Sequence, residues 1–218
     1  MTRSHSFDEA VQTASLSRRK GDALASRNRV VDASKAYEAG LNALDRELDA
    51  ETSSSVDAAE LWGMRGGLLR RMGRLDDALE SYASGADIEV GDELATTYNR
   101  GNKIKLALVA GRATLDEVQP DLIDLRSAIE QTISENERAA SDAWTYADLG
   151  DTLLLLGDVL RAIDCYRTFN ERARTDSPTT TLSVLHEIRE ALEGHDDPRA
   201  ARFTADLLHI EAVLSATS

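Results

Sequence analysis

The stretch WTYADLGDTLLLLGDVLRAIDCY, residues 144–166, gathers four aspartates and the only cysteine of the chain. Two carboxylates can serve as general acid and general base when they approach closely in a shielded cleft, because one of them then holds a proton. Asp148, Asp151 and Asp158 are the candidates for that chemistry, and the thiol of Cys165 is the candidate nucleophile. Their use depends on the elements that hold them.

Histidines are the other candidates for catalysis or metal binding, and the chain has four of them: His5, His186, His195 and His209. The segment HEIRE, which begins at His186, lacks the second histidine that a helical zinc-protease motif places four residues after the first. His195, Asp196 and Asp197 are adjacent in sequence, which is typical of a turn and a helix cap rather than a metal site. No glycine-rich phosphate loop occurs. We expect no metal and no cofactor.

The chain carries a formal net charge of −14, which opposes binding to phosphate backbones and to anionic lipid surfaces. We therefore expect no nucleic-acid partner and no membrane partner for this acidic protein. No uncharged apolar run approaches the length of a membrane span, and the first residues lack the apolar core of a secretory signal. A single cysteine forms no intramolecular disulfide, which fits a cytoplasmic location.

The stretch around Asp151 also has two earlier counterparts, in which the same residue types follow a glycine at the same offsets. The three sets are Gly150, Leu153, Gly157, Ala162 and Tyr166; Gly66, Leu69, Gly73, Ala78 and Tyr82; and Gly21, Leu24, Ala33 and Tyr37. A weaker copy supplies only Gly101 and Ile104. Small residues at fixed offsets predict close helix crossings, and the large residues between them fill the space on either side.

This pattern resembles the tetratricopeptide repeat (TPR), a unit of about 34 residues that folds as two antiparallel helices. The resemblance implies an all-α, right-handed superhelical solenoid of about four helix pairs, with C-terminal capping helices near 180–193 and 198–216. The whole chain, 1–218, would be one domain, and the four repeats would span 14–47, 59–92, 94–135 and 143–176. Ser17 and Thr97 depart from the family, which prefers a large aromatic residue there.

Local signals refine the helix ends. Ser6 and Glu9 have the spacing of a capping box, and so do Thr114 and Glu117, while Pro120 suits a first helical turn. Gly157 followed by Asp158 predicts the turn between two helices, which gives Asp158 a structural explanation. The longer spacing from Gly101 to Gly150 predicts longer helices in the third repeat.

In the TPR family the first helix of each pair lines the concave surface, where ligands usually bind. The first helices here are rich in Lys and Arg, and the positions expected to face the groove are Arg18, Arg70, Arg71, Tyr98, Asn99, Asn102, Lys105, Asp148 and Asp151. The basic members would bind an acidic peptide or a partner's acidic surface, and Asp148 and Asp151 would receive a basic group. The alternative is that these charges only solvate exposed helix faces. A chaperone clamp, which some relatives form, is interrupted here by Asp22 and Gly63.

The repeat register explains the aspartates and Cys165 as scaffold residues, so we predict that the chain is not an enzyme. The predicted function is a non-catalytic protein-interaction module, an adaptor or scaffold, that binds a protein or peptide partner in its concave groove. The alternative function is a peptide-responsive sensor whose superhelix changes shape on binding. A hydrolase using the C-terminal His and Asp residues is a third hypothesis. We expect a monomer or a homodimer.

Overall fold

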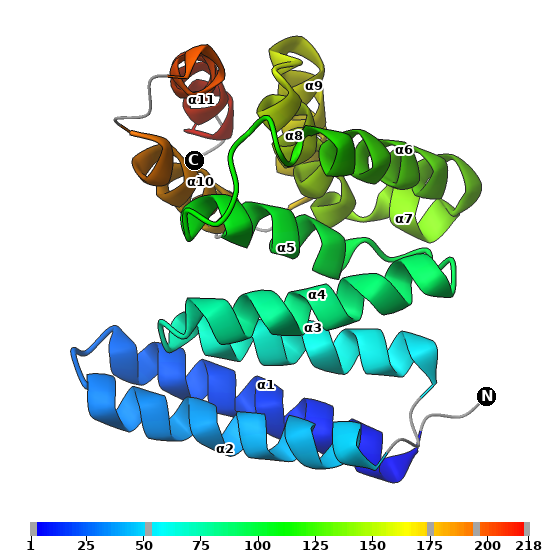
Figure 1. Ribbon diagram of the computed structural model, residues 1–218, viewed down its shortest axis with the longest axis vertical. Coiled ribbons are helices and arrows are strands. Elements are labelled where there is room, and N and C mark those ends of the chain that lie inside the picture. The colour runs from blue at the N-terminus through cyan, green and yellow to red at the C-terminus, as the bar shows by residue number, and fades with distance from the viewer. Residues whose placement is uncertain (1–3, 51–53, 174–176, 194–196, 216–218) are drawn as a thin grey trace. The chain divides into compact units, whose positions relative to one another are not determined.

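The computed structural model describes residues 4–50, 54–173, 177–193 and 197–215, of which the side chains of 177–180 are not described. The described residues form eleven α-helices and no strand (Figure 1), so the predicted all-α class is confirmed. Backbone contacts divide the chain into two compact units, Met1–Lys103 and Ile104–Ser218. Both the single domain and the handedness of the superhelix stay predictions.

The N-terminal unit consists of two helix pairs and the beginning of a fifth helix. Its helices are α1 (His5–Ala25), α2 (Val30–Asp49), α3 (Ser55–Arg71), α4 (Leu75–Gly91) and the first residues of α5 (Tyr98–Val109). Figure 1 shows α1 beside α2 and α3 beside α4, and these two pairs share the most extensive contacts in the unit. Helices α1 and α2 also contact α3, so the pairs stack on each other.

The C-terminal unit surrounds one apolar core. Its helices are the rest of α5, α6 (Gln119–Glu135), α7 (Glu137–Ser141), α8 (Ala143–Leu156), α9 (Val159–Arg172), α10 (Ser177–Leu192) and α11 (Pro198–Ser215). Helix α8 pairs with α9, α6 packs on α8, and α11 packs on both α8 and α9. Phe203, Leu207 and Ile210 of α11 enter the same core as Tyr166 and Phe169 of α9. The predicted C-terminal capping helices are therefore present.

The tight turns within three pairs depend on a residue with positive φ. Gly73 and Gly157 end the first helices of the second and fourth pairs with φ of 73° and 81°. In the first pair Asn28 takes this conformation with φ of 57°, because asparagine tolerates the left-handed region better than most side chains. Asp158 then caps α9 by accepting from Arg161 N at 3.4 Å. The predicted turn at Gly157 is confirmed.

The sequence offset from glycine to tyrosine corresponds to a direct contact in each of these pairs. A Cβ added to Gly21 would lie 2.1 Å from Tyr37 Cε1, one added to Gly66 would lie 2.8 Å from Tyr82 Cε1, and one added to Gly150 would lie 3.0 Å from Tyr166 Cζ. Each ring therefore occupies the space that a side chain on the first helix would fill. The three tyrosines are at most 4% exposed.

The expectation of longer helices in the third repeat is wrong. Helix α5 has 12 residues, and the extra chain forms a turn-rich connection over 110–118 and the short helix α7. The Thr114–Glu117 capping box is formed, because Glu117 N donates to Thr114 Oγ1 at 3.3 Å and Thr114 N donates to Glu117 Oε2 at 2.8 Å. It closes a turn that precedes α6 rather than beginning the helix itself. Pro120 lies in the first turn of α6 as predicted.

The capping box predicted at Ser6 and Glu9 is also wrong. Ser4 is the residue that caps α1, by accepting from Phe7 N at 3.1 Å. Ser6 lies inside the helix, and its hydroxyl donates to Glu47 Oε1 at 3.2 Å. A tertiary contact with α2 therefore uses the hydroxyl that the local pattern assigned to the cap.

We predict that Gly21→Ala destabilises the protein, because the new Cβ would force the Tyr37 ring out of its place. Overpacking of this kind costs about 1–3 kcal/mol, which exceeds the gain of about 0.5–1 kcal/mol from replacing a helical glycine by alanine. Urea unfolding followed by circular dichroism measures the difference. Gly91→Ala is the control, since nothing lies within 4 Å of a Cβ at that position. Equal midpoints for the two variants would contradict the contact.

Candidate functional site

The residues predicted to line a groove divide between the two units. The N-terminal unit holds Arg18 on α1, Arg70 and Arg71 on α3, and Tyr98, Asn99 and Asn102 on α5. The C-terminal unit holds Lys105 on α5 and Asp148 and Asp151 on α8. The two sets are therefore two separate candidate sites, and each has its own geometry.

In the C-terminal unit Lys105 contacts both of the predicted aspartates. Lys105 Nζ lies 2.8 Å from Asp151 Oδ2 and 3.3 Å from Asp148 Oδ1, and Tyr166 donates its hydroxyl to Asp151 Oδ1 at 2.6 Å. The side chains of Lys105 and Asp151 are only 12% and 7% exposed. The basic group that we expected a partner to bring is thus supplied by Lys105 of the same chain.

Burial and charge act in opposite directions on this cluster. Burial alone would lower the pKa of Lys105, but the attraction of Asp151 and Asp148 outweighs it and holds that pKa above its ordinary value. Burial raises the pKa of Asp148, while Lys105 acts in the opposite direction. Burial and the neighbouring Asp151 carboxylate raise the pKa of Tyr166 well above its usual range. Lys105 and Tyr166 therefore keep their protons, and neither is poised as a base near neutral pH.

The N-terminal unit contains a counterpart of this cluster. Tyr37 donates its hydroxyl to Asp22 Oδ1 at 2.9 Å, and Arg71 Nε lies 3.0 Å from the same oxygen. Asp22 and Asp151 each follow the crossing glycine of their pair and precede its tyrosine by the same number of residues. In the second pair this position is Gly67, which has no carboxylate. Sequence reasoning treated Asp22 as an interruption, although its equal offset was a signal for the aspartate–tyrosine bond.

Asn99 lies inside the N-terminal unit rather than on its surface. It is 1% exposed, its Nδ2 donates to Glu89 Oε1 and to Ala59 O at 2.9 Å each, and its backbone N donates to Glu89 Oε1 at 2.9 Å. The expectation that Asn99 lies exposed on a groove surface is therefore wrong. A Cβ on Gly63 or Gly85 would lie within 3 Å of the Asn99 side chain, so both glycines make room for it.

Glu89 caps the beginning of α5 from outside that helix. Its carboxylate accepts from the backbone N of Asn99 at 2.9 Å and of Arg100 at 3.1 Å, and these N–H groups have no intrahelical partner. Glu89 is 2% exposed, and burial raises its pKa although these donors act in the opposite direction. The carboxylate fixes where α5 starts and thereby where Tyr98 points.

Residues of three first helices form one continuous stripe in the N-terminal unit, which we call the first-helix face. It consists of Arg18 and Asp22 of α1, Met64, Gly67 and Arg71 of α3, and Tyr98 and Asn102 of α5. Spacing of three or four residues keeps the members of each helix on one side. The Arg71–Asp22 ion pair joins α1 to α3, and the Tyr98 ring lies against Gly63 of α3.

A pocket of 360 Å³ adjoins the α5 end of this face. Its lining residues are Val56, Ala59, Glu60, Met64, Glu89, Thr96, Tyr98 and Asn99. Tyr98 is 49% exposed and packs edge-on against Tyr82, with 6.3 Å between the ring centroids. Asn102 Nδ2 donates to Tyr98 O at 2.8 Å, which holds the beginning of α5 in place. The pocket therefore has a fixed aromatic wall.

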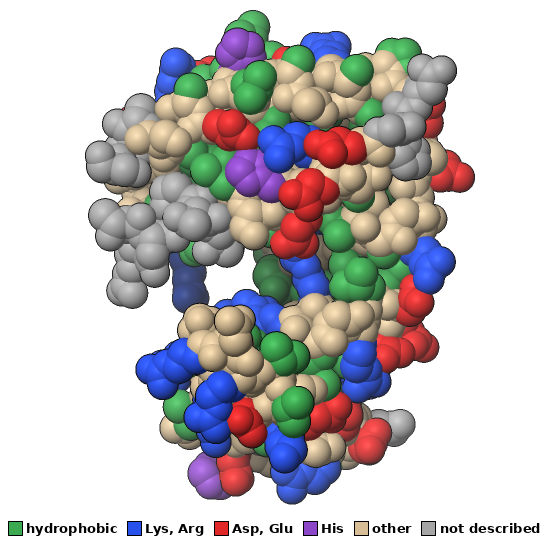
Figure 2. All heavy atoms as spheres, turned by 90° about the vertical axis from the view of Figure 1, so that its left-hand side faces the viewer, with side chains coloured by type: hydrophobic (Ala, Val, Ile, Leu, Met, Phe, Trp, Pro, Cys, Tyr) green, Lys and Arg blue, Asp and Glu red, His purple; other side chains and the backbone are tan. Residues whose placement is uncertain are grey.

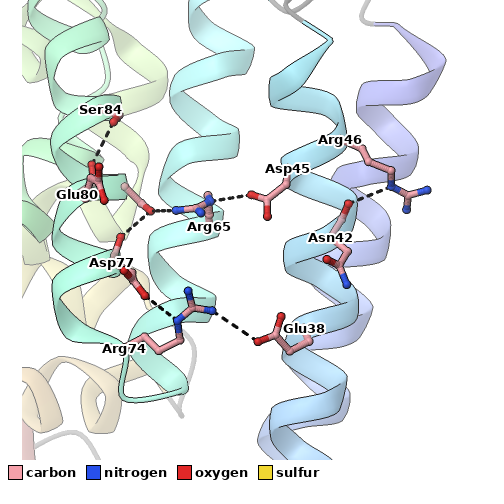
Figure 3. A network of polar contacts seen from close by, with 10 residues as sticks. Glu38, Asn42, Asp45, Arg46, Arg65, Arg74, Asp77, Glu80 and Ser84 are labelled. Atoms are coloured by element: carbon pink, nitrogen blue, oxygen red, sulfur yellow. Dashed lines mark hydrogen bonds and ion pairs between the residues drawn. The ribbon is translucent and has the colours of Figure 1, made fainter.

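Other cations of the N-terminal unit are held by acids of the second helices (Figure 3). Arg65 of α3 lies 2.7 Å from Asp45 of α2 and donates to Ser81 of α4, and Arg74 lies 2.7 Å from Asp77 and 3.5 Å from Glu38. Figure 2 shows Lys and Arg interspersed with Asp and Glu on the visible face rather than gathered in one patch. Exposed pairs of this kind stabilise weakly, by about 0–1 kcal/mol, but they do neutralise the arginines.

Of the candidates for catalysis, Asp148 and Asp151 meet at Lys105, whereas Asp158 caps α9. Among the described residues, no group of three or more His, Cys, Asp or Glu could hold a metal ion. Burial raises the pKa of the Cys165 thiol to about 11, so the thiolate is disfavoured near neutral pH. His186 Nε2 lies 2.7 Å from Glu211 Oε1 and joins α10 to α11. His195 and Asp196 lie outside the described residues.

The repeated glycine–tyrosine crossing between antiparallel helices decides the fold. The fold is TPR-like. Helix α3 with α4 and helix α8 with α9 show the crossing together with the turn glycine, and α1 with α2 shows it with asparagine at the turn. The resemblance read from the sequence is thus confirmed as a fold.

Comparison with known proteins finds two solved structures that align with most of this chain. BtubC from P. vanneervenii is 13% identical, with a TM-score of 0.48, over 96% of this chain and 91% of that chain. TTC0263, a thermophilic TPR protein in Thermus thermophilus, is 16% identical, with a TM-score of 0.48, over 89% of this chain and 99% of that one. No family model and no curated protein matches the sequence. Within the described residues, each helix is too short or too polar to cross a membrane.

We predict that Lys105→Met destabilises the C-terminal unit by about 3 kcal/mol, because it leaves the buried Asp151 carboxylate without its cation. Asp148→Asn is the matched control in the same cluster. Its side chain is 36% exposed, so its loss costs about 1 kcal/mol or less. Urea unfolding followed by tryptophan fluorescence measures both. A larger effect for Asp148→Asn would show that Asp148 is the main partner of Lys105.

We also predict that stability falls at alkaline pH. Burial and the bond to Asp22 raise the pKa of Tyr37 to about 12, so the folded protein keeps a proton that the unfolded chain loses near pH 10. The unfolded state is therefore favoured increasingly as the pH rises from about 10 to about 12. Urea midpoints at pH 8 and pH 11 should drop less for Tyr37→Phe than for wild type. Equal drops would contradict this role.

Proposed function

We propose that the chain is a non-catalytic protein-interaction module, an adaptor or scaffold, that holds a partner peptide along the first-helix face of its N-terminal unit. The observation that carries this proposal is the 360 Å³ pocket at one end of that face, bounded by Val56 and Tyr98. These two side chains are 51% and 49% exposed. Large apolar side chains beside a preformed pocket are typical of binding surfaces, because a partner that covers them removes apolar area from water.

The other end of the first-helix face is basic. Arg18 is exposed on α1, and Arg70 and Arg71 end α3. Arg71 already contacts Asp22, so its charge is partly used within the unit. An acidic group on the partner is favoured at this end by Arg18. The proposed partner therefore places an apolar contact at Tyr98 and acidic residues toward the end of α3.

Lys105, Asp148 and Asp151 have no part in this proposal. Lys105 neutralises the two aspartates, and a partner that took Lys105 away would leave the buried Asp151 carboxylate without a cation. The cluster therefore supports the proposal only indirectly, since it fixes α8 against α5 in the C-terminal unit.

Cys165 fits a reducing compartment, and we place the module in the cytoplasm.

Selection of random displayed peptides on the full chain tests the proposal. We predict that Tyr98→Ala weakens the selected peptides by about tenfold or more, since aromatic anchors carry a large share of binding energy. Arg18→Glu should weaken the acidic ones among them. Leu160→Ala, which truncates another exposed apolar residue, and Lys20→Glu, which reverses a charge elsewhere on α1, are the controls. The dissociation constants come from fluorescence anisotropy.

Two results would overturn the proposal. Selection that enriches no peptide would remove the binding function itself. Peptides that bind Tyr98→Ala and Arg18→Glu as tightly as wild type would place the interaction on another surface. Identical helical circular dichroism for all variants is required before affinities are compared.

A further inference from the structure

The pocket beside Tyr98 has walls that suit a carbon chain. Val56, Ala59 and Met64 come from one side of α3, and the ring of Tyr98 faces them from α5. A side chain lying between them would remove apolar surface from water along its length. Long aliphatic stems fit such a slot whether they end in an apolar group or a charged one.

The polar part of the lining accepts hydrogen bonds and carries negative charge. Among the described residues, the pocket is lined by two acids, Glu60 and Glu89, and by no Lys, Arg or His. Glu89 is 2% exposed, and it forms no ion pair with a Lys or Arg of the described chain. Two backbone N–H groups and the Asn99 amide donate hydrogen bonds to the Glu89 carboxylate and replace the water that would otherwise solvate it. Arg100 favours the charged form of Glu89 more weakly. A cation placed in the pocket would lower the cost of keeping this carboxylate buried.

A second acceptor lies beside the same wall. Asn99 Oδ1 is buried and has no hydrogen-bond donor among the described residues, although the Nδ2 of the same amide makes two bonds. A Cβ on Gly63 would lie 2.9 Å from this oxygen and 2.9 Å from Tyr98 Cε1. Because glycine has no side chain, both groups can pack against α3 at this position. Buried acceptors without donors are rare in folded proteins. The unpaired oxygen adds to the negative potential at this wall of the pocket.

We propose that this pocket binds the basic side chain, arginine or lysine, of the partner peptide. The aliphatic stem lies between Met64 and Tyr98, and the cationic head donates toward Glu60 and the Glu89–Asn99 acceptors. The exposed Tyr98 ring adds a cation–π contact. Charge complementarity selects this occupant, because an acidic side chain would meet two carboxylates and a purely apolar one would leave the acceptors unsatisfied.

This inference rests on the proposed function and adds an orientation to it. Glu60 and Arg71 are separated along α3 by about 16 Å, at 1.5 Å per residue. An extended peptide covers that distance in about five residues. The partner segment therefore has a basic residue at the Tyr98 end and acidic residues about five positions away, toward Arg18 and Arg71.

Amide chemical shifts of the labelled full chain, titrated with four small probes of matched chain length, test the inference. The probes are n-butylguanidinium, n-butylammonium, n-butanol and butyrate. We expect the two cations to shift the amides of Ala59, Met64, Tyr98 and Asn99, with butanol at least about tenfold weaker and butyrate without effect. Glu60→Gln should weaken the cations and leave butanol unchanged. Glu80→Gln, an exposed acid on α4, is the matched control.

Each other outcome overturns the inference. Equal binding of butanol and the cations would make the pocket an apolar site, and stronger binding of butyrate would make it an anion site. No shift in these amides with any probe would mean that the pocket takes no side chain of this length. Glu89→Gln should also weaken the binding of the cationic probes. If Glu89→Gln unfolds α5, Tyr98→Leu is used in its place, since leucine keeps the apolar wall without the aromatic ring.

The two proposals fail separately. If selected peptides depend on Tyr98 but no cationic probe binds, the interaction module is supported and the basic anchor is rejected. Cationic probes that bind while no peptide is enriched would leave the pocket chemistry standing and remove the peptide function.

Discussion

In each of three helix pairs the ring of a tyrosine lies directly on a glycine of the preceding helix. This contact sets the distance between the two helix axes, because no atom of the glycine separates the ring from the backbone. The tyrosines are buried, so their hydroxyls need partners, and Asp22 and Asp151 provide them in the first and fourth pairs. The buried Asp151 in turn needs a cation, which is Lys105, and the half-exposed Asp22 pairs with Arg71. One packing requirement thus decides where several charges must go.

The Lys and Arg side chains on the first helices of the pairs can therefore have either of two roles. A cation on a first helix can serve a partner or can neutralise the aspartate that holds the tyrosine. Lys105 is 12% exposed and contacts two carboxylates, so it serves the scaffold. Arg71 is 36% exposed and contacts one, so it stands between the two roles. The second pair has Gly67 in place of the aspartate, and there α3 has no such carboxylate to neutralise. The surface that we propose for recognition is the one at Tyr98 and Met64.

The fold could be predicted from the sequence because its determinants are small residues at fixed offsets. Gly150, Ala162 and Tyr166 meet in space since the offset between two helices of a hairpin is constant, and Gly157 can be recognised as a turn from its residue type. The site was harder to predict. Asn99 carries a polar side chain at a position that looked exposed, but Gly63 and Gly85 leave a space into which it folds. Asn99 is buried because Gly63 and Gly85 have no side chains, and not because of its own residue type. Likewise the ion pairs of Lys105 depend on which helix lies opposite α5, and the irregular third repeat hides that register.

Glu89 illustrates why local patterns fail at α5 in particular. Several helices here begin with a cap from the residue directly before them, as α1, α3 and α8 do with Ser4, Ser54 and Asp142. Helix α5 receives its cap from the carboxylate of Glu89 on α4, so its start depends on a tertiary contact. The same carboxylate lines the pocket beside Tyr98, and a group bound there would act on the helix start as well as on the pocket. A cation bound there would favour the ionised form of Glu89, which accepts stronger hydrogen bonds from the first N–H groups of α5 than the protonated acid does.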